Sequence, residues 1–283
     1  MMRSTIQKVF GALLVVLLSI SLNLTVPVQA SEAAETVESI QAAYGQFLER
    51  IDGKYLHEKV SHVLKTEWDQ AGIYAMDTPT KVRVGCWATA VAQILYYHKL
   101  LPHGNVSYPC SEGYTITENL NSYPFDWSLF VDKIAGNTPK ESIAQVAKYS
   151  YFTAAAIQKD FGVGGHVLKG KSFKNLLETH FDCTVTEYEF LHGSFLKERS
   201  DVVQIIKKEM AAARPVAFFF GNQYDWGHAV VIDGCLEKNN HFLVHINQGI
   251  GGSGNGAYEL FDPVIPSYGD MYWRVIMTIK PKK

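Results

Sequence analysis

A helix-forming stretch that opens with a glycine and a cysteine most constrains how this chain can fold. Apolar residues recur at helical spacing from Trp87 to about residue 98, which predicts a core-facing helix. Turn-forming residues 77–80 precede it, so we expect the helix to begin near Gly85 and to carry Cys86 in its first turn. The backbone N–H groups and macrodipole at a helix start favour a thiolate. The structural alternative is that Cys86 is a small buried residue or half of a disulfide.

Length and composition bound the class of protein. With 283 residues the chain can hold one large domain or two small ones. A hydrophobic content of 47% and a charged content of 19% are typical of a folded globular protein. The net charge of −2 gives no reason to expect nucleic acid or an acidic membrane surface as a partner.

The first 30 residues have the pattern of a cleavable secretory signal peptide. Arg3 and Lys8 precede an apolar run over residues 9–26, and Val28–Ala30 fits a small-x-small cleavage site. The run is close to the roughly 20 residues that span a membrane, but its polar interruptions favour cleavage over anchoring. We therefore expect a secreted or extracytoplasmic chain with no stable membrane insertion after cleavage. Residues 31–60 then form a short N-terminal or pro-segment, and residues 61–283 form one domain.

The order of elements predicts an α+β fold, because helical periodicity dominates the first half and strand alternation the second. A long polar loop is expected over residues 103–126, and Asp233 and Gly234 are expected to end a strand. The predicted helices cover residues 86–100, 125–134, 140–156, 172–181 and 201–213, and the predicted strands cover residues 184–190, 215–220, 228–232, 241–247, 257–261 and 273–279.

The four cysteines leave the disulfide pairing open. An exported chain can form disulfides, and a free Cys86 leaves at most one bridge among Cys110, Cys183 and Cys235. No two cysteines have the C-x-x-C spacing of a structural zinc site. We expect no metal and no cofactor.

Two strand ends carry side chains that suit Cys86 chemically. His228 stands at the start of an apolar strand, and Asn247 stands at the end of another, beside a glycine-rich loop. His228 lies about 140 residues after Cys86, within the roughly 130–150 typical of papain-type enzymes, and Asn247 lies slightly beyond that range. In such enzymes a thiolate attacks, an imidazole transfers protons and an amide orients the imidazole.

The chain resembles the streptopain-like cysteine peptidases, family C10, over roughly residues 60–281. The resemblance rests on three blocks, which are Gly85-Cys86-x-Ala88-Thr89-Ala90-x-Ala92-Gln93-Ile94-x-x-Tyr97-His98, Gly227-His228-Ala229-x-Val231-Ile232-Asp233-Gly234 and His245-x-Asn247-x-Gly249-x-Gly251-Gly252.

The resemblance implies a papain-like fold, with the helical half packed on an antiparallel sheet or barrel, and hydrolysis of proteins or peptides. It implies that Cys86 is the nucleophile, His228 the general base and acid, and Asn247 the residue that orients the imidazole. Gln70 lies where the family has its oxyanion-hole glutamine, and each such donor typically contributes roughly 3–4 kcal/mol.

Three departures from the family pattern bear on activity. Gln248 stands where the family has the tryptophan that shields the histidine, and Ile250 replaces the second tryptophan of that loop. Another ring such as Trp226 could supply the shield. The segment before the peptidase region is also shorter than the family's usual pro-domain. The alternative is therefore a papain-like exported binding module with weak or no catalysis.

Two further patterns have ordinary explanations. Residues 249–254 match G-x-G-x-x-G, but a strand rather than a helix is predicted to follow, which argues against dinucleotide binding. His241 and His245 are expected on one strand face, roughly 13 Å apart, too far to share one metal ion directly.

Overall fold

The computed structural model describes residues 58–162, 172–221, 227–261 and 273–282, all within one compact unit, Val37–Lys283. The expected signal peptide, nearly all of the segment 31–60, and Trp226 lie outside the described residues. Among the described residues, no helix is long and apolar enough to cross a membrane.

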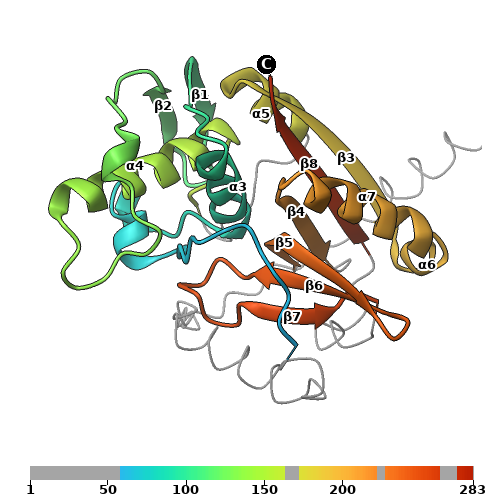
Figure 1. Ribbon diagram of the computed structural model, residues 1–283. Helices are drawn as coiled ribbons and strands as arrows, with labels where there is room; N and C mark the ends of the chain where they lie inside the picture. Colours follow the sequence, from blue (N-terminus) through green and yellow to red (C-terminus); the bar gives the residue numbers. More distant parts are fainter. Residues whose placement is uncertain (1–57, 163–171, 222–226, 262–272, 283) are drawn as a thin grey trace, which may run out of the picture. The chain divides into compact units, whose positions relative to one another are not determined.

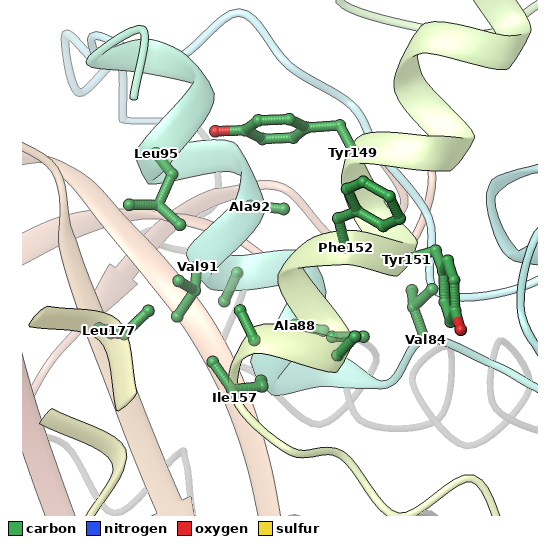
Figure 2. Packing of buried hydrophobic residues seen from close by; sticks show 14 of the residues in the cluster. Val84, Ala88, Val91, Ala92, Leu95, Tyr149, Tyr151, Phe152, Ile157 and Leu177 are labelled. Carbon is green, nitrogen blue, oxygen red and sulfur yellow. The ribbon is translucent and has the colours of Figure 1, made fainter. Parts of the chain in front are cut away.

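Two packed helices form the core of the first half (Figure 1). Helix α3 spans Cys86–Tyr97 and α4 spans Lys140–Ala156, as the periodicity predicts. Figure 2 shows the small side chain of Ala92 facing Phe152 of α4, with Leu95 further along α3 and Tyr149 beside it. Small residues on α3 let the helices approach closely, and Val91, Ala92, Leu95 and Tyr149 are fully buried. Short 3-10 helices lie at Gly72–Ala75, Pro79–Lys81 and Trp127–Leu129.

The segment 103–126 contains a β-hairpin that the sequence did not predict. Strand β1 (Asn105–Pro109) pairs antiparallel with β2 (Thr115–Asn119). Val106, Tyr108 and Ile116 point inward, and the polar residues between them are exposed. The alternation is only two or three residues long, so surrounding polar residues hid it. The helix expected over 125–134 is also wrong, since only the 3-10 turn Trp127–Leu129 forms there.

A six-stranded antiparallel sheet makes up the second half and confirms the α+β class. Its order is β3-β8-β4-β5-β6-β7 (Figure 1). The strands are β3 (Cys183–Leu191), β4 (Val216–Gly221), β5 (Gly227–Lys238), β6 (His241–Asn247), β7 (Gly256–Glu259) and β8 (Trp273–Pro281). The accompanying helices are α5 (Phe173–His180), α6 (His192–Lys197) and α7 (Arg199–Ala211).

Both faces of the sheet are covered, which explains why its central strands are almost uniformly apolar. Ala217, Ala229 and Met277 face the core that contains α3 and α4. Phe218 and Val230 face a second core, to which α6 and α7 contribute Phe195, Val202 and Ile206.

Strand β5 does not end at Asp233 and Gly234 as the sequence suggested. It continues to Lys238, with a register irregularity between Ile232 and Gly234. The Asp233 carboxylate is fully buried, yet it accepts from the Leu64 backbone N–H at 3.2 Å and lies 2.6 Å from His245 Nδ1. These partners satisfy a side chain that otherwise favours a turn. The start of β5 and the end of β6 lie at the same end of these two paired antiparallel strands, beside α3.

Candidate active site

Cys86 is the first residue of α3. Its neighbour Gly85 has φ 85° and ψ 159°, a backbone conformation that suits glycine. The cysteine is half-buried. Burial raises the pKa of its thiol, while the backbone N–H groups of Ala229 and Trp87 and the charge of Lys159 partly offset this rise. The Ala229 contact brings the first turn of α3 against the start of β5.

His228 is the second residue of β5 and is buried. Its Nε2 atom lies 3.1 Å from the backbone oxygen of Gln248. Burial lowers the pKa of His228 to about 4, although the Gln248 carbonyl acts in the opposite direction. The ring of Phe220 approaches the imidazole edge-on, with 6.1 Å between ring centroids. Since a carbonyl only accepts, the hydrogen of a neutral imidazole stays on Nε2 and Nδ1 keeps its lone pair.

Asn247 is the last residue of β6, and its side-chain amide is buried. Its Nδ2 donates to the Thr66 carbonyl at 2.6 Å, and its Oδ1 accepts from the Gly249 N–H at 3.0 Å. The buried amide of Gln93 bonds both ends of the Asn247 amide. The imidazole is thus contacted by the backbone of the residue that follows Asn247.

Gln70 is half-buried and lies close in space to the start of α3. Its backbone oxygen accepts from the Val84 N–H at 2.8 Å, two residues before Cys86. On the other side, the carboxylate of Asp69 accepts from the N–H groups of Gln70 and Ala71 at 2.6 and 3.0 Å. These bonds fix the backbone that carries Gln70.

The two positions that depart from the family pattern are both filled by buried side chains. Gln248 hydrogen-bonds Tyr258 through its side chain, and its Oε1 has no partner among the described residues. Ile250 packs into the second core. Trp226 lies outside the described residues; within the described part of the chain, the ring of Phe220 lies against His228.

Sequence reasoning gave no role to two buried polar residues near this site. Gln93 interrupts the apolar face of α3 and is fully buried; a buried amide needs partners, which was the available signal. Lys159 is buried beyond the end of α4, and its Nζ donates to the Asp160 carbonyl at 2.9 Å. Burial lowers the pKa of Lys159 to about 8.

All four cysteines are described, and none is in a disulfide. Within the described ranges, no group of three or more His, Cys, Asp or Glu side chains could hold a metal ion. His245 pairs with Asp233 and His241 pairs with Glu259, at 2.6 and 2.9 Å. The glycine-rich segment 249–254 leads into strand β7, which does not fit a dinucleotide fingerprint.

Comparison with known proteins identifies the family of this chain. The model of the peptidase C10 family matches residues 68–258. This chain belongs to the peptidase C10 family. The match contains all four candidate residues, and it runs from the segment before Gln70 to strand β7 of the sheet.

Curated relatives within the C10 family are distant. Streptopain of Streptococcus pyogenes serotype M1 is 25% identical over 196 residues, which cover 65% of this chain and 46% of streptopain. Streptopain of serotype M28 (strain MGAS6180) is 24% identical with the same coverage. The chain therefore spans a little under half the length of these relatives.

Solved structures support the C10 fold. Active wild-type interpain A cysteine protease of Prevotella intermedia aligns with a TM-score of 0.62 at 24% identity, over 80% of this chain and 96% of interpain A. A prointerpain A fragment from the same organism aligns with a TM-score of 0.61 at 22% identity, over 84% and 80% of the two chains.

Proposed function

We propose that this chain is a secreted cysteine endopeptidase in which Cys86 is the nucleophile and His228 the general base and acid. The observation that carries the proposal is the contact between the first turn of α3 and the start of β5, where the Ala229 backbone reaches the Cys86 thiol. Membership of the C10 family and the unbridged state of Cys86 support the same reading. The signal-like residues 1–30 support export.

The reaction begins with a proton transfer inside the Cys86–His228 pair. Because Nε2 is engaged by the Gln248 carbonyl, Nδ1 takes the proton from Cys86 Sγ. The thiolate attacks the scissile carbonyl carbon, a C–S bond forms, and the carbonyl oxygen becomes an oxyanion. Gln70 and the Cys86 backbone N–H are the proposed oxyanion donors.

Collapse of this intermediate breaks the C–N bond, and the proton on Nδ1 passes to the leaving amine. The product is a thioester between Cys86 and the acyl part of the substrate. Water then attacks the thioester, with Nδ1 accepting one of its protons and returning it to the departing sulfur. The cycle restores the neutral pair and needs no cofactor.

The test is labelling with an epoxide-type inactivator of cysteine peptidases, followed by intact mass measurement. The signal-less protein is expected to gain one inhibitor mass under reducing conditions, and Cys86→Ala to gain none. Cys235→Ala is the matched control, because Cys235 is also a half-exposed free thiol but lies on the far part of β5. It should label like the parent.

Peptide hydrolysis gives the second readout. Cys86→Ala and His228→Ala should each abolish hydrolysis while keeping the fold, judged by circular dichroism. A parent protein that neither labels nor cleaves would favour the non-catalytic binding module instead.

A further inference from the structure

Helix α3 buries two polar side chains among its apolar ones, those of Thr89 and Gln93. Gln93 is fully buried. Its amide pairs with that of Asn247 in both directions. Gln93 Nε2 donates to Asn247 Oδ1 at 3.3 Å, and Asn247 Nδ2 donates to Gln93 Oε1 at 3.1 Å. We call this the Gln93–Asn247 amide pair. It joins residues 154 positions apart.

Backbone groups fix the orientation of both amides. The Gly249 N–H must face Asn247 Oδ1, and the Thr66 carbonyl must face Asn247 Nδ2, at 3.0 and 2.6 Å. The Trp68 N–H lies 3.5 Å from Gln93 Oε1. Reversing either amide would set like atoms against each other, so the pair has a single satisfied arrangement.

The pair joins the three segments that carry the proposed chemistry. Asn247 and Gly249 flank Gln248, whose carbonyl contacts the imidazole. Thr66 and Trp68 precede Gln70 in a segment that also accepts a hydrogen bond from the Gly251 N–H at 3.1 Å. Gln93 lies two turns along the helix that begins at Cys86.

Close packing leaves the loop little freedom to compensate. Gly249 has φ 66°, and a Cβ there would lie 3.2 Å from the Thr89 side chain. The loop backbone therefore packs directly against α3, and the amide pair fixes its position relative to the helix. A displacement of the loop would displace the Gln248 carbonyl with it.

We infer that Gln93 is a positioning residue, which acts through Asn247 to hold the Gln248 carbonyl on the imidazole of His228 and to couple the Gln70 segment to the same loop. The inference rests on the proposed function. It assigns Asn247 an indirect part, since its amide fixes the loop and the backbone of the next residue holds the imidazole Nε2.

The first test is Gln93→Met, which keeps an unbranched side chain of similar length and removes both amide groups. We expect kcat/KM for a peptide substrate to fall about 10- to 100-fold, mainly through kcat, because a displacement of about 1 Å at a catalytic group has effects of this size. Gln145→Met is the matched control. Gln145 is also a buried helical glutamine that binds a loop, through the Asp126 N–H at 3.0 Å, but it lies in α4. The control should lose stability and keep kcat.

The second test is Gln93→Glu, which makes the hydrogen bonds between residue 93 and Asn247 depend on pH. A protonated carboxyl can donate to Asn247 Oδ1 and accept from Nδ2, as the amide does. In an ionised carboxylate, the oxygen that replaces Nε2 would face Asn247 Oδ1, so two acceptors would oppose each other and the hydrogen bond to Oδ1 would be lost. Burial raises the pKa of such a carboxyl, so the activity of the variant relative to the parent should be near one at low pH and fall as pH rises. A residue that only fills space would give a constant ratio.

The outcomes separate the two proposals. A parent that labels at Cys86, together with a folded Gln93→Met variant whose kcat/KM stays within about twofold, would overturn the positioning role and leave the proposed function intact. A parent that does not label overturns both. If Gln93→Met does not fold, the Gln93→Glu ratio decides, and a flat ratio contradicts the inference.

Discussion

At the scale of single residues, the proposed chemistry depends on two groups, Cys86 and His228, whose neutral forms are favoured by burial. Burial raises the pKa of the Cys86 thiol and lowers that of His228 to about 4. The proton transfer between them leaves their total charge unchanged, so it avoids the cost of adding net charge to a buried site. The pH dependence of the free enzyme should report the ionisations of this pair.

In the expected pH profile of kcat/KM, activity is lost on the acidic side only at an unusually low pH. Below a pH of about 4, His228 carries a proton before substrate arrives and cannot accept one from Cys86. We therefore predict that kcat/KM for a small peptide is flat from neutral pH downwards and falls tenfold per pH unit only below about 4. Rates are measured after brief exposure, with full recovery at neutral pH as the control for unfolding. A lower limb near the ordinary histidine value of about 6.5 would contradict this reading.

Sequence patterns located the candidate residues better than they described their contacts. Cys86 lies at the start of a helix, His228 near the start of a strand and Asn247 at the end of another, as the periodicity of these segments predicted. The role of Gln93 did not, because its partner Asn247 lies 154 residues away. The amide on the apolar face of α3 signals that Gln93 needs a partner, but no local pattern identifies a partner so distant in sequence.

At the scale of elements, the N-terminal strap, residues 60–70, has little regular structure of its own and depends on β5. The Val63 N–H donates to the Asp233 carbonyl at 3.0 Å, and Leu64 donates to the Asp233 carboxylate. The ring of His62 stacks on His245 with 3.9 Å between centroids. The strap leads directly to Gln70, so its attachment to β5 bears on the oxyanion side of the site.

Gly234 is what permits the strap to lie so close. A Cβ at this position would lie 2.1 Å from the Ser61 backbone oxygen, so Gly234→Ala must push the strap away. We expect a loss of about 1–3 kcal/mol of unfolding free energy, measured by urea denaturation, and faster hydrogen exchange in the strap. Gly136→Ala is the control, because a Cβ there meets nothing within 4 Å, and it should be neutral. Equal unfolding free energies for the two variants would contradict the prediction, because the strap would then move away from Gly234 at no cost in stability.

The same contacts explain why β5 was predicted too short. An Asp-Gly pair is typical of a turn when read alone. Here the glycine is needed for the approach of Ser61, and the aspartate is needed for Leu64 and His245. Both needs arise from tertiary contacts, which no local pattern reveals.

At the scale of the whole molecule, the sheet separates two hydrophobic cores. Helix α3 packs on one face of the sheet and helix α7 on the other. The α+β order follows from sequence, since a helical half precedes a strand half. The two-sided burial of the sheet is visible in strands such as β4, which is apolar throughout. The strand order was not predictable. The last strand, β8, lies between β3 and β4, and pairing between strands so far apart in sequence leaves no local pattern.

One buried carboxylate links helix α7 to the last strand of the sheet. Glu209 of α7 lies 2.6 Å from Arg214 Nε and 3.2 Å from Lys280 Nζ on β8. Burial opposes ionisation of Glu209, but the hydrogen bonds from Arg214 and Lys280 outweigh it and lower its pKa. Because the folded state then binds its proton less readily than the unfolded chain does, Glu209 stabilises the fold above its ordinary pKa of about 4.5. That stabilisation disappears as pH falls through the lowered value.

We predict that Glu209→Gln loses about 2–3 kcal/mol of unfolding free energy at neutral pH, since it removes charge-assisted hydrogen bonds from a buried site. Its stability should also depend less on pH than that of the parent below a pH of about 5, measured by urea unfolding across that range. Glu237→Gln is the matched control, because Glu237 pairs with Lys207 at 2.8 Å on the exposed surface, where such pairs contribute little. If the parent and Glu209→Gln lose stability in parallel on acidification, Glu209 is not the group that links α7 to β8 in a pH-dependent way.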